Sequence, residues 1–472
     1  MDQEKLASFV SDVWETSILP KITDYIRIPC KSPAFDPAWE KNGFLDQAVG
    51  LIRSWCVEQG VPGLVSEIVR IPGRSPLLFM EVPASDGSTD GDTVLLYGHY
   101  DKQPEMTEWR DDLGPWIPKR EGDKLYGRGG ADDGYAAFAS VLALAGVRKF
   151  GGAHKRAVIL IEGCEESGSF DLPHYLDLLG DRMGKVSLVV CLDSGCGNYD
   201  QLWVTTSLRG LVGGTLEVKV LEQGVHSGDA SGVVPSSFRI ARLLLDRLED
   251  PKTGQILPAA FHGAIPDERR EQAEVSGRVL GETVSGRFPW AGGTRAMATE
   301  HAELILNRTW RPYLAVTGAS GLPALASAGN VLRPSTALKL SLRLPPTLDA
   351  ATAGKELQRI LTEDPPYGAQ VSFHFEEPGQ GWNAPALAPW LKASIEAASQ
   401  ASFGREACFM GEGGSIPFMG MLGRRFPEAQ FMITGVLGPE SNAHGPNEFL
   451  HVPMGKKLTA AVAAVLDAHA RR

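Results

Sequence analysis

The sequence lacks several features that would place it in a special class. No run of 18 apolar residues occurs in its 472 positions, so we expect no membrane-spanning helix. The N-terminal segment MDQEKLASFVSDVWE is acidic and amphipathic and has no apolar stretch typical of a signal peptide. Internal repeats are absent, and the only low-complexity segment is the expected surface loop at 84–92, ASDGSTDGD.

Paired cysteines are missing, and positive charge falls short of negative charge. The six cysteines, at 30, 56, 164, 191, 196 and 408, form no CxxC pair. This usage favours a reduced, cytoplasmic setting. A net charge of -11 argues against nucleic acid as the main partner, because phosphate binding needs a basic face.

The length favours two domains, and the pattern of elements divides the chain in three. Over 1–206, buried strands at 93–97, 157–161 and 187–192 alternate with helices at 134–147 and 171–181, which indicates an α/β layer structure. Over 207–380, alternating strands and helices without this order indicate an α+β insertion. A helix from about 386 and a buried strand at 431–437 then complete the first domain over 381–472.

Polar side chains follow the buried strands of the first domain, where ligands bind in α/β sheets. Six such residues follow strands, and Asp132 stands at the start of a helix. Together they are two histidines and five carboxylates: His99, Asp101, Asp132, Glu165, Glu166, Asp193 and His444. Five negative charges at one sheet edge would repel each other without cations. We therefore expect two divalent metals, and the His/carboxylate set suits zinc, manganese or cobalt.

The chemistry of a two-metal site suggests a role for each group. Asp132 is expected to bridge the metals, and one of Glu165 and Glu166 to ligate while the other stays free as a base. Asp101 stands two residues after His99 and can orient its imidazole.

Each of these signals has a simpler structural interpretation when it is taken alone. His99-x-Asp101 and the Glu165–Glu166 pair are common in ordinary turns. The stretch GRGGADDG could indicate a dinucleotide loop, although it lacks the GxGxxG spacing, and MGEGGS could hold a phosphate. The signals indicate a metal site only when they are taken together, because three consecutive buried strands each end in a potential metal ligand.

Taken in order, the motifs GHYDKQP, YGRGGADDG, EGCEESGS, LDSG, GVHSG and NAHGPNE resemble the M20 family of dimetal peptidases, most closely its carnosinase-like, cytosolic non-specific dipeptidase branch. The resemblance covers nearly the whole chain. It implies a Zn-peptidase-like α/β catalytic domain, with a mixed sheet and flanking helices, and an inserted α+β lid domain that forms a homodimer.

The resemblance also implies roles for individual residues. One metal would be held by His99, Asp132 and Asp193, and the other by Asp132, Glu166 and His444, with Glu165 as the general base and Asp101 as the orienting aspartate. The peptide bond Asp132–Asp133 is commonly cis in this family. His226 would stabilise the oxyanion from the partner's lid, and the substrate carboxylate would be held by Asn330, Arg343 and Ser415.

The predicted function is hydrolysis of the amide bond of dipeptides or similar small substrates with a free carboxylate. A water between two metals, zinc first and manganese or cobalt as alternatives, would attack while Glu165 takes its proton. An N-acyl amino acid deacylase or desuccinylase is the alternative, since the motifs do not distinguish a peptide from an acyl amide. The remote alternative is a non-catalytic protein that binds a small ligand.

Overall fold

The structure, a computed structural model, describes residues 1–88, 91–414 and 416–472. Part of the expected loop at 84–92 and the predicted substrate residue Ser415 therefore lie outside the described residues. The chain divides into two compact units, the first of Met1–Thr206, Ala384–Met410 and Met421–Arg472, and the second of Ser207–Asn383 and Gly411–Gly420.

The first unit is built on a six-stranded mixed sheet in the order β1-β2-β6-β3-β7-β17. Its strands are β1 (Val65–Val69), β2 (Leu77–Val82), β3 (Asp92–His99), β6 (Arg156–Glu162), β7 (Lys185–Cys191) and β17 (Gln430–Ile433). Strands β6, β3, β7 and β17 run parallel, whereas β2 is antiparallel to both β6 and β1. The carboxyl ends of the four parallel strands therefore meet at one edge, as the sequence predicts.

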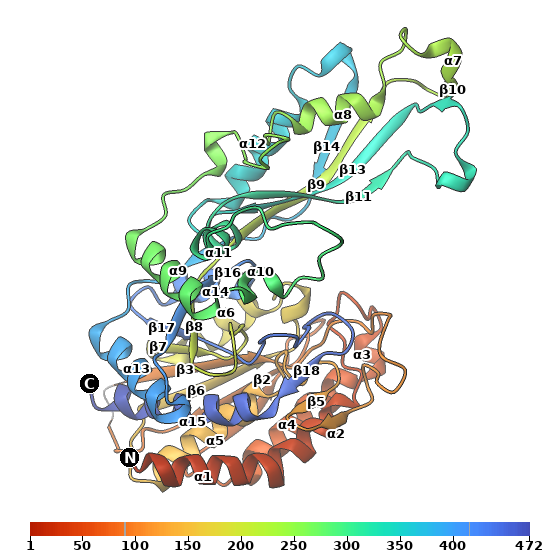
Figure 1. Cartoon of the computed structure of the whole chain (residues 1–472). Coiled ribbons are helices and arrows are strands. Elements are labelled where there is room, and N and C mark those ends of the chain that lie inside the picture. The colour runs from red at the N-terminus through yellow and green to blue at the C-terminus, as the bar shows by residue number, and fades with distance from the viewer. Residues whose placement is uncertain (89–90, 415) are drawn as a thin grey trace. The chain divides into compact units, whose positions relative to one another are not determined.

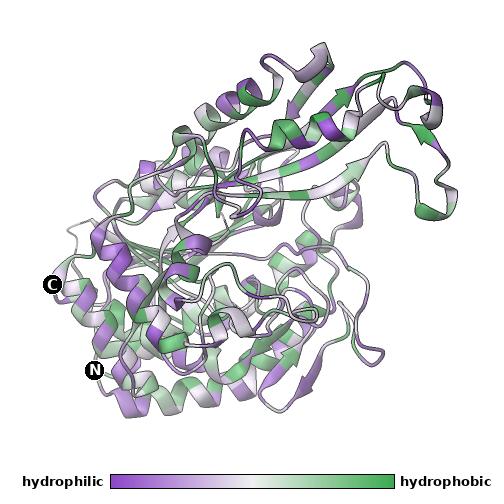
Figure 2. Ribbon diagram, turned by 45° about the horizontal axis from the view of Figure 1, so that its top comes forward, coloured by the Kyte–Doolittle hydropathy of each residue, from purple (hydrophilic) through white to green (hydrophobic). Residues whose placement is uncertain are grey.

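Helices flank this sheet and give the α/β class expected from the sequence (Figure 1). α5 packs against β3 and β6, and α15 packs against α5, α1 and α13. The helices are α1 (Gln3–Val13), α2 (Leu19–Ile26), α3 (Trp39–Asn42), α4 (Phe44–Glu58), α5 (Ala136–Lys149), α6 (Leu172–Met183), α13 (Pro389–Phe403) and α15 (Val452–Ala470), and α14 (Pro417–Arg425) is divided between the two units. Many of them are banded in green and purple in Figure 2, which is typical of helices with one apolar face.

Two small sheets complete this part of the chain. One has the order β18-β5-β4, from β18 (Phe449–His451), β5 (Lys124–Tyr126) and β4 (Lys119–Glu121). The other, β15-β8-β16, lies where the chain passes between the two units and contains β15 (Trp382–Asn383), β8 (Trp203–Leu208) and β16 (Cys408–Glu412).

The second unit has a four-stranded antiparallel sheet in the order β11-β13-β9-β14. Its strands are β9 (Gly210–Lys219), β11 (Tyr313–Ser320), β13 (Ser335–Leu344) and β14 (Gln370–Phe375), with a separate pair of β10 (Val225–His226) and β12 (Val331–Leu332). β13 alternates buried with partly buried residues along its whole length, as its ALKLSLRL pattern predicts for a strand with one face on the core.

Helices α8 (Ser237–Leu245) and α12 (Ala350–Thr362) pack on this sheet and on each other. The other helices are α7 (Ser227–Ala230), α9 (Asp267–Leu280), α10 (Thr283–Gly286) and α11 (His301–Thr309). Strand β11 and helices α9 and α11 lie in a region where the sequence analysis assigns no element. Glycine and proline are scattered there, and the short amphipathic stretches between them give weak periodicity.

No helix among the described residues is both long and apolar enough to cross a membrane. All six cysteines are buried.

Candidate metal centre

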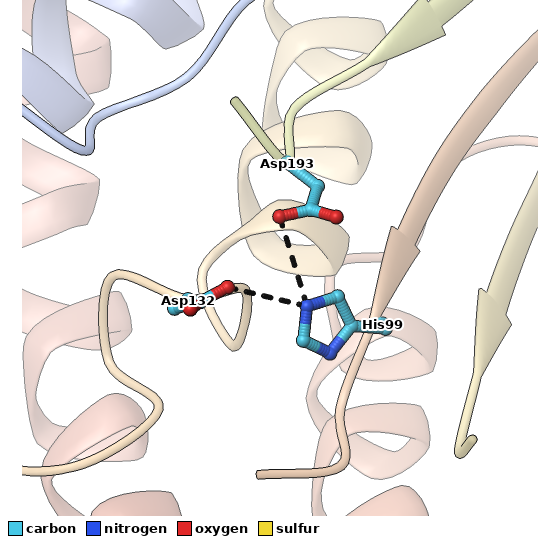
Figure 3. Close-up of side chains that lie close together, drawn as sticks. All are labelled: His99, Asp132 and Asp193. Atoms are coloured by element: carbon cyan, nitrogen blue, oxygen red, sulfur yellow. Dashed lines mark ion pairs between the residues drawn. The ribbon is translucent and has the colours of Figure 1, made fainter. Parts of the chain in front are cut away.

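His99 and Asp193 lie beside each other at the carboxyl edge of the central sheet, and Asp132 completes the group (Figure 3). His99 is the last residue of β3, and Asp193 follows β7. His99 Nε2 lies 3.4 Å from Asp132 Oδ1 and 3.7 Å from Asp193 Oδ1. All three side chains are buried, so their charges are poorly screened by water.

Asp132 also belongs to a second group, with Glu166 and His444. His444 Nε2 lies 3.1 Å from Asp132 Oδ2 and 3.3 Å from Glu166 Oε2. Within each group the ligand atoms lie within 4.8 Å of one another. The two oxygens of one carboxylate thus face two different histidines, which is the geometry expected of a shared ligand.

Burial and the crowding of carboxylates shift the pKa values of His99 and Glu166. Burial alone would lower the pKa of His99, but the nearby carboxylates of Asp193, Asp101 and Asp132 raise it well above its usual value. Burial and the Asp132 carboxylate raise the pKa of Glu166. Among the described residues, His99 Nε2 is a buried nitrogen without a hydrogen-bond partner. An imidazole nitrogen left open among carboxylates fits a metal ion of the zinc, manganese or cobalt type.

Asp101 connects the two sides of the site. His99 Nδ1 lies 3.1 Å from the Asp101 carbonyl oxygen and 3.4 Å from its Oδ1. The same carboxylate accepts hydrogen bonds from the backbone N–H groups of Glu165 and Glu166, at 3.1 and 3.0 Å. Asp101 therefore positions the turn that carries both glutamates, a contact that the sequence analysis does not foresee.

Local packing fixes the loop that carries Asp132. A Cβ atom at Gly98 would lie 2.5 Å from Ala136 Cβ and 2.6 Å from Asp133 Oδ2, so only glycine fits there. Asp133 accepts a hydrogen bond from the His99 backbone N–H at 3.3 Å. The Asp132–Asp133 peptide bond is cis, as the family resemblance implies.

A buried ion pair joins the Asp132 loop to the His444 loop. Arg128 Nη1 donates to Glu448 Oε2 at 2.6 Å, and Arg128 Nη2 donates to the His444 carbonyl oxygen at 3.2 Å. The Gly129 N–H donates to Glu448 Oε1 at 2.8 Å. We call Arg128 and Glu448 the loop clamp. No sequence pattern predicts this pair, although both residues stand in the motifs YGRGGADDG and NAHGPNE.

Three of the remaining predicted residues lie in the second unit. His226 pairs with Val331 across β10 and β12, and the Asn330 carbonyl oxygen accepts from the Ser227 N–H at 2.9 Å, so His226 and Asn330 are close together. Arg343 lies on β13.

Comparison with known proteins identifies the same family as the motifs. The model of Peptidase family M20/M25/M40 matches residues 95–468. The cysteinylglycine-S-conjugate dipeptidase of Corynebacterium striatum is 27% identical over 384 residues, which cover 78% of this chain and 80% of that protein. The human Beta-Ala-His dipeptidase is 25% identical over 57% of this chain and 54% of its own length.

The fold agrees with these similarities. The solved structure of the dipeptidase Dug1p from Saccharomyces cerevisiae covers 100% of both chains with a TM-score of 0.77 at 19% identity. The expected family and fold class are thereby confirmed.

Proposed function

Because the chain belongs to peptidase family M20/M25/M40 and is a metallopeptidase of that family, we propose that it hydrolyses dipeptides with a free carboxylate through a two-metal centre. The observation that carries the proposal is the position of Asp132, whose two oxygens face His99 and His444 in two separate ligand groups. The dipeptidases among its relatives support a peptide substrate.

Two divalent ions, zinc or else manganese or cobalt, would be held by His99, Asp132 and Asp193 and by Asp132, Glu166 and His444, and would activate a water and polarise the scissile carbonyl. Glu165 then accepts a proton from the attacking water and passes it to the leaving amine. Burial and the Asp193 carboxylate raise the pKa of Glu165, which favours a base that can also return the proton.

His226 is proposed to stabilise the oxyanion. Its Nδ1 accepts a hydrogen bond from the Gly228 N–H at 3.1 Å, so in the neutral ring Nε2 carries the proton and can donate. Arg343, Asn330 and Ser415 are proposed to hold the substrate carboxylate, with Arg343 supplying the charge.

A substrate panel tests the reaction. Dipeptides are compared with N-acetyl and N-succinyl amino acids, each with zinc, manganese and cobalt in turn, and dipeptides should be hydrolysed fastest. Preference for the acyl amino acids would replace the proposal with a deacylase. Absence of any hydrolysis by fully metal-loaded protein would indicate a binding protein.

We further propose a homodimer, formed through the second unit, in which His226 serves the partner's active site. Mixing Glu165→Gln with His226→Ala under subunit exchange should then restore activity, since one site per heterodimer holds an intact Glu165 and a donated histidine. If exchange is confirmed and activity stays absent, His226 acts within its own chain.

A further inference from the structure

Gln103 contacts one of the expected metal ligands, although it is not among the predicted site residues. Its Nε2 donates a hydrogen bond to Glu166 Oε2 at 2.6 Å. The same oxygen lies 3.3 Å from His444 Nε2, within the ligand group that also contains Asp132. A carboxylate oxygen has two lone pairs, so the hydrogen bond from Gln103 leaves one of them for a metal ion.

The two adjacent glutamates differ in this contact. The backbone N–H groups of Glu165 and Glu166 both donate to the Asp101 carboxylate. Among the residues that the structure describes, however, no side chain donates a hydrogen bond to the Glu165 carboxylate. The sequence leaves open which glutamate binds metal. The contact with Gln103 supports Glu166 as the fixed ligand and Glu165 as the free base.

The segment from His99 to Gln103 alternates between two sides. His99, Asp101 and Gln103 all contact groups of the metal centre. The Tyr100 hydroxyl and the Lys102 ammonium group instead donate to backbone carbonyl oxygens elsewhere, at 2.6 and 2.8 Å, and both side chains are buried. Alternate residues of an extended chain point to opposite sides. Gln103 is therefore aimed at the metal centre by the same alternation that aims His99 and Asp101.

The segment at 32–34 anchors both partners of the hydrogen bond. The Ser32 N–H donates to the Lys102 carbonyl oxygen at 2.9 Å, directly before the glutamine. The Ala34 N–H donates to Ser167 Oγ at 2.9 Å, directly after the second glutamate. A hydrogen bond between two anchored segments costs less conformational entropy than one between mobile segments. The geometry is therefore suited to holding a metal ligand in one orientation.

We propose that Gln103 is a positioning residue for the ion held by Asp132, Glu166 and His444, which we call the second ion. Gln103 acts through Glu166, whose carboxylate it holds toward the other two ligands. This inference rests on the proposed two-metal function. An amide donor suits the role because it is neutral and does not repel a cation. Loss of such a contact typically lowers metal affinity by about 10–100-fold.

The test measures metal affinity. The metal-free, full-length chain is titrated with Co²⁺ in competition with a chelator, and the wild type should bind two ions. Gln103→Met removes the donor at similar volume and should weaken one ion by about 10–100-fold while leaving the other unchanged. Gln59→Met is the matched control, because Gln59 is also half-buried and donates to the Trp55 carbonyl oxygen at 3.1 Å. It should leave both ions unchanged.

Two backgrounds identify which ion is affected. Asp193→Ala removes a ligand of the first group only, and Glu166→Gln removes a ligand of the second group only. Gln103→Met should weaken the remaining ion in the Asp193→Ala background and leave the remaining ion in the Glu166→Gln background unchanged. A general structural disturbance would affect the ions in both backgrounds alike.

The outcomes separate the inference from the proposed function. Unchanged affinity for both ions in Gln103→Met, or an equal loss in the two backgrounds, would overturn the role of Gln103 and leave the two-metal centre intact. A wild-type chain that binds fewer than two Co²⁺ ions would instead remove the proposed function. Gln103→Ala also removes the donor and adds no bulk, so it carries the same expectation if Gln103→Met does not fold.

Discussion

The two units each gather charge of one sign, and they do so from different kinds of sequence. In the first unit, carboxylates and histidines follow strand ends, where Asp132 faces both His99 and His444. In the second, the side chains of Arg209, from a strand connection, and Arg308, from α11, come together at Gly413. Buried carboxylates in the first group repel one another unless cations join them, whereas Arg209 in the second donates to carbonyl oxygens of the backbone. The comparison teaches that a gathering of like charges can leave a place for a ligand or can be satisfied by the backbone of the chain itself.

Removing the carboxylate shared by both ligand groups is the strongest way to break this comparison. Asp132→Ala should lose both ions and lower kcat/KM by at least ~10³-fold, because each metal loses a ligand and the two lose their bridge. The ions bound per chain are counted by elemental analysis. Asp181→Ala, at an exposed position of α6, is the control and should keep both. Two ions per chain in Asp132→Ala would show that Asp132 is not the bridge.

Glu165→Gln separates proton transfer from metal binding within the first site. The amide cannot take the proton, so kcat should fall by about 10²–10⁴-fold, while the metal content stays that of the wild type. Glu166→Gln, one residue further on, should instead lose metal as well as activity. Glu165→Gln at near-wild-type turnover would mean that another group is the base.

The metal-ligand residues and the arginines at Gly413 differ in how far the sequence predicts them. The ligands His99, Glu166 and Asp193 follow apolar runs that read as strands, and parallel strands bring such positions to one edge. Arg209 and Arg308 follow no such rule, since helix packing and the path of the Gly413 backbone bring them together. The ion pair of the loop clamp could not be predicted either, because sequence spacing does not show that Arg128 contacts Glu448, 320 positions away.

The loop clamp offers a sharper contrast, because its charges are compensated by the chain itself. Arg128→Met leaves the Glu448 carboxylate buried and unpaired and should lower the free energy of unfolding by about 3–5 kcal/mol. Added metal should not restore this loss. Arg120→Met breaks a pair with Glu15 that is 43% and 38% exposed, and should cost about 0–1 kcal/mol. Denaturant unfolding measures both, and equal losses would show that the clamp contributes no more than a surface pair.

Glu162, a buried carboxylate at the end of β6, shows whether the negative charge of the metal centre also affects residues that are not expected to bind metal. Its carboxylate lies buried and accepts hydrogen bonds from Tyr97 and from Ser169, the latter at 2.9 Å. Burial raises the pKa of Glu162 from 4.5 to about 8, with a further contribution from the Asp101 carboxylate.

Between these two pH values the folded chain keeps a proton on Glu162 that the unfolded chain has lost. The contribution of Glu162 to stability is therefore full below about pH 4.5 and declines as the pH rises to about 8, by about 1 kcal/mol per pH unit. Glu162→Gln can still accept from Tyr97 and Ser169 but cannot ionise, so its stability relative to wild type should rise over this window. Denaturant unfolding at pH 5, 6, 7 and 8 measures the difference between the two proteins, in which the titration of all other groups cancels. Glu40→Gln, at an exposed position of α3, should show no such trend. A difference that stays constant from pH 5 to 8 would mean that Glu162 is ionised in the folded chain, and that Asp101 and the ligands tolerate its charge.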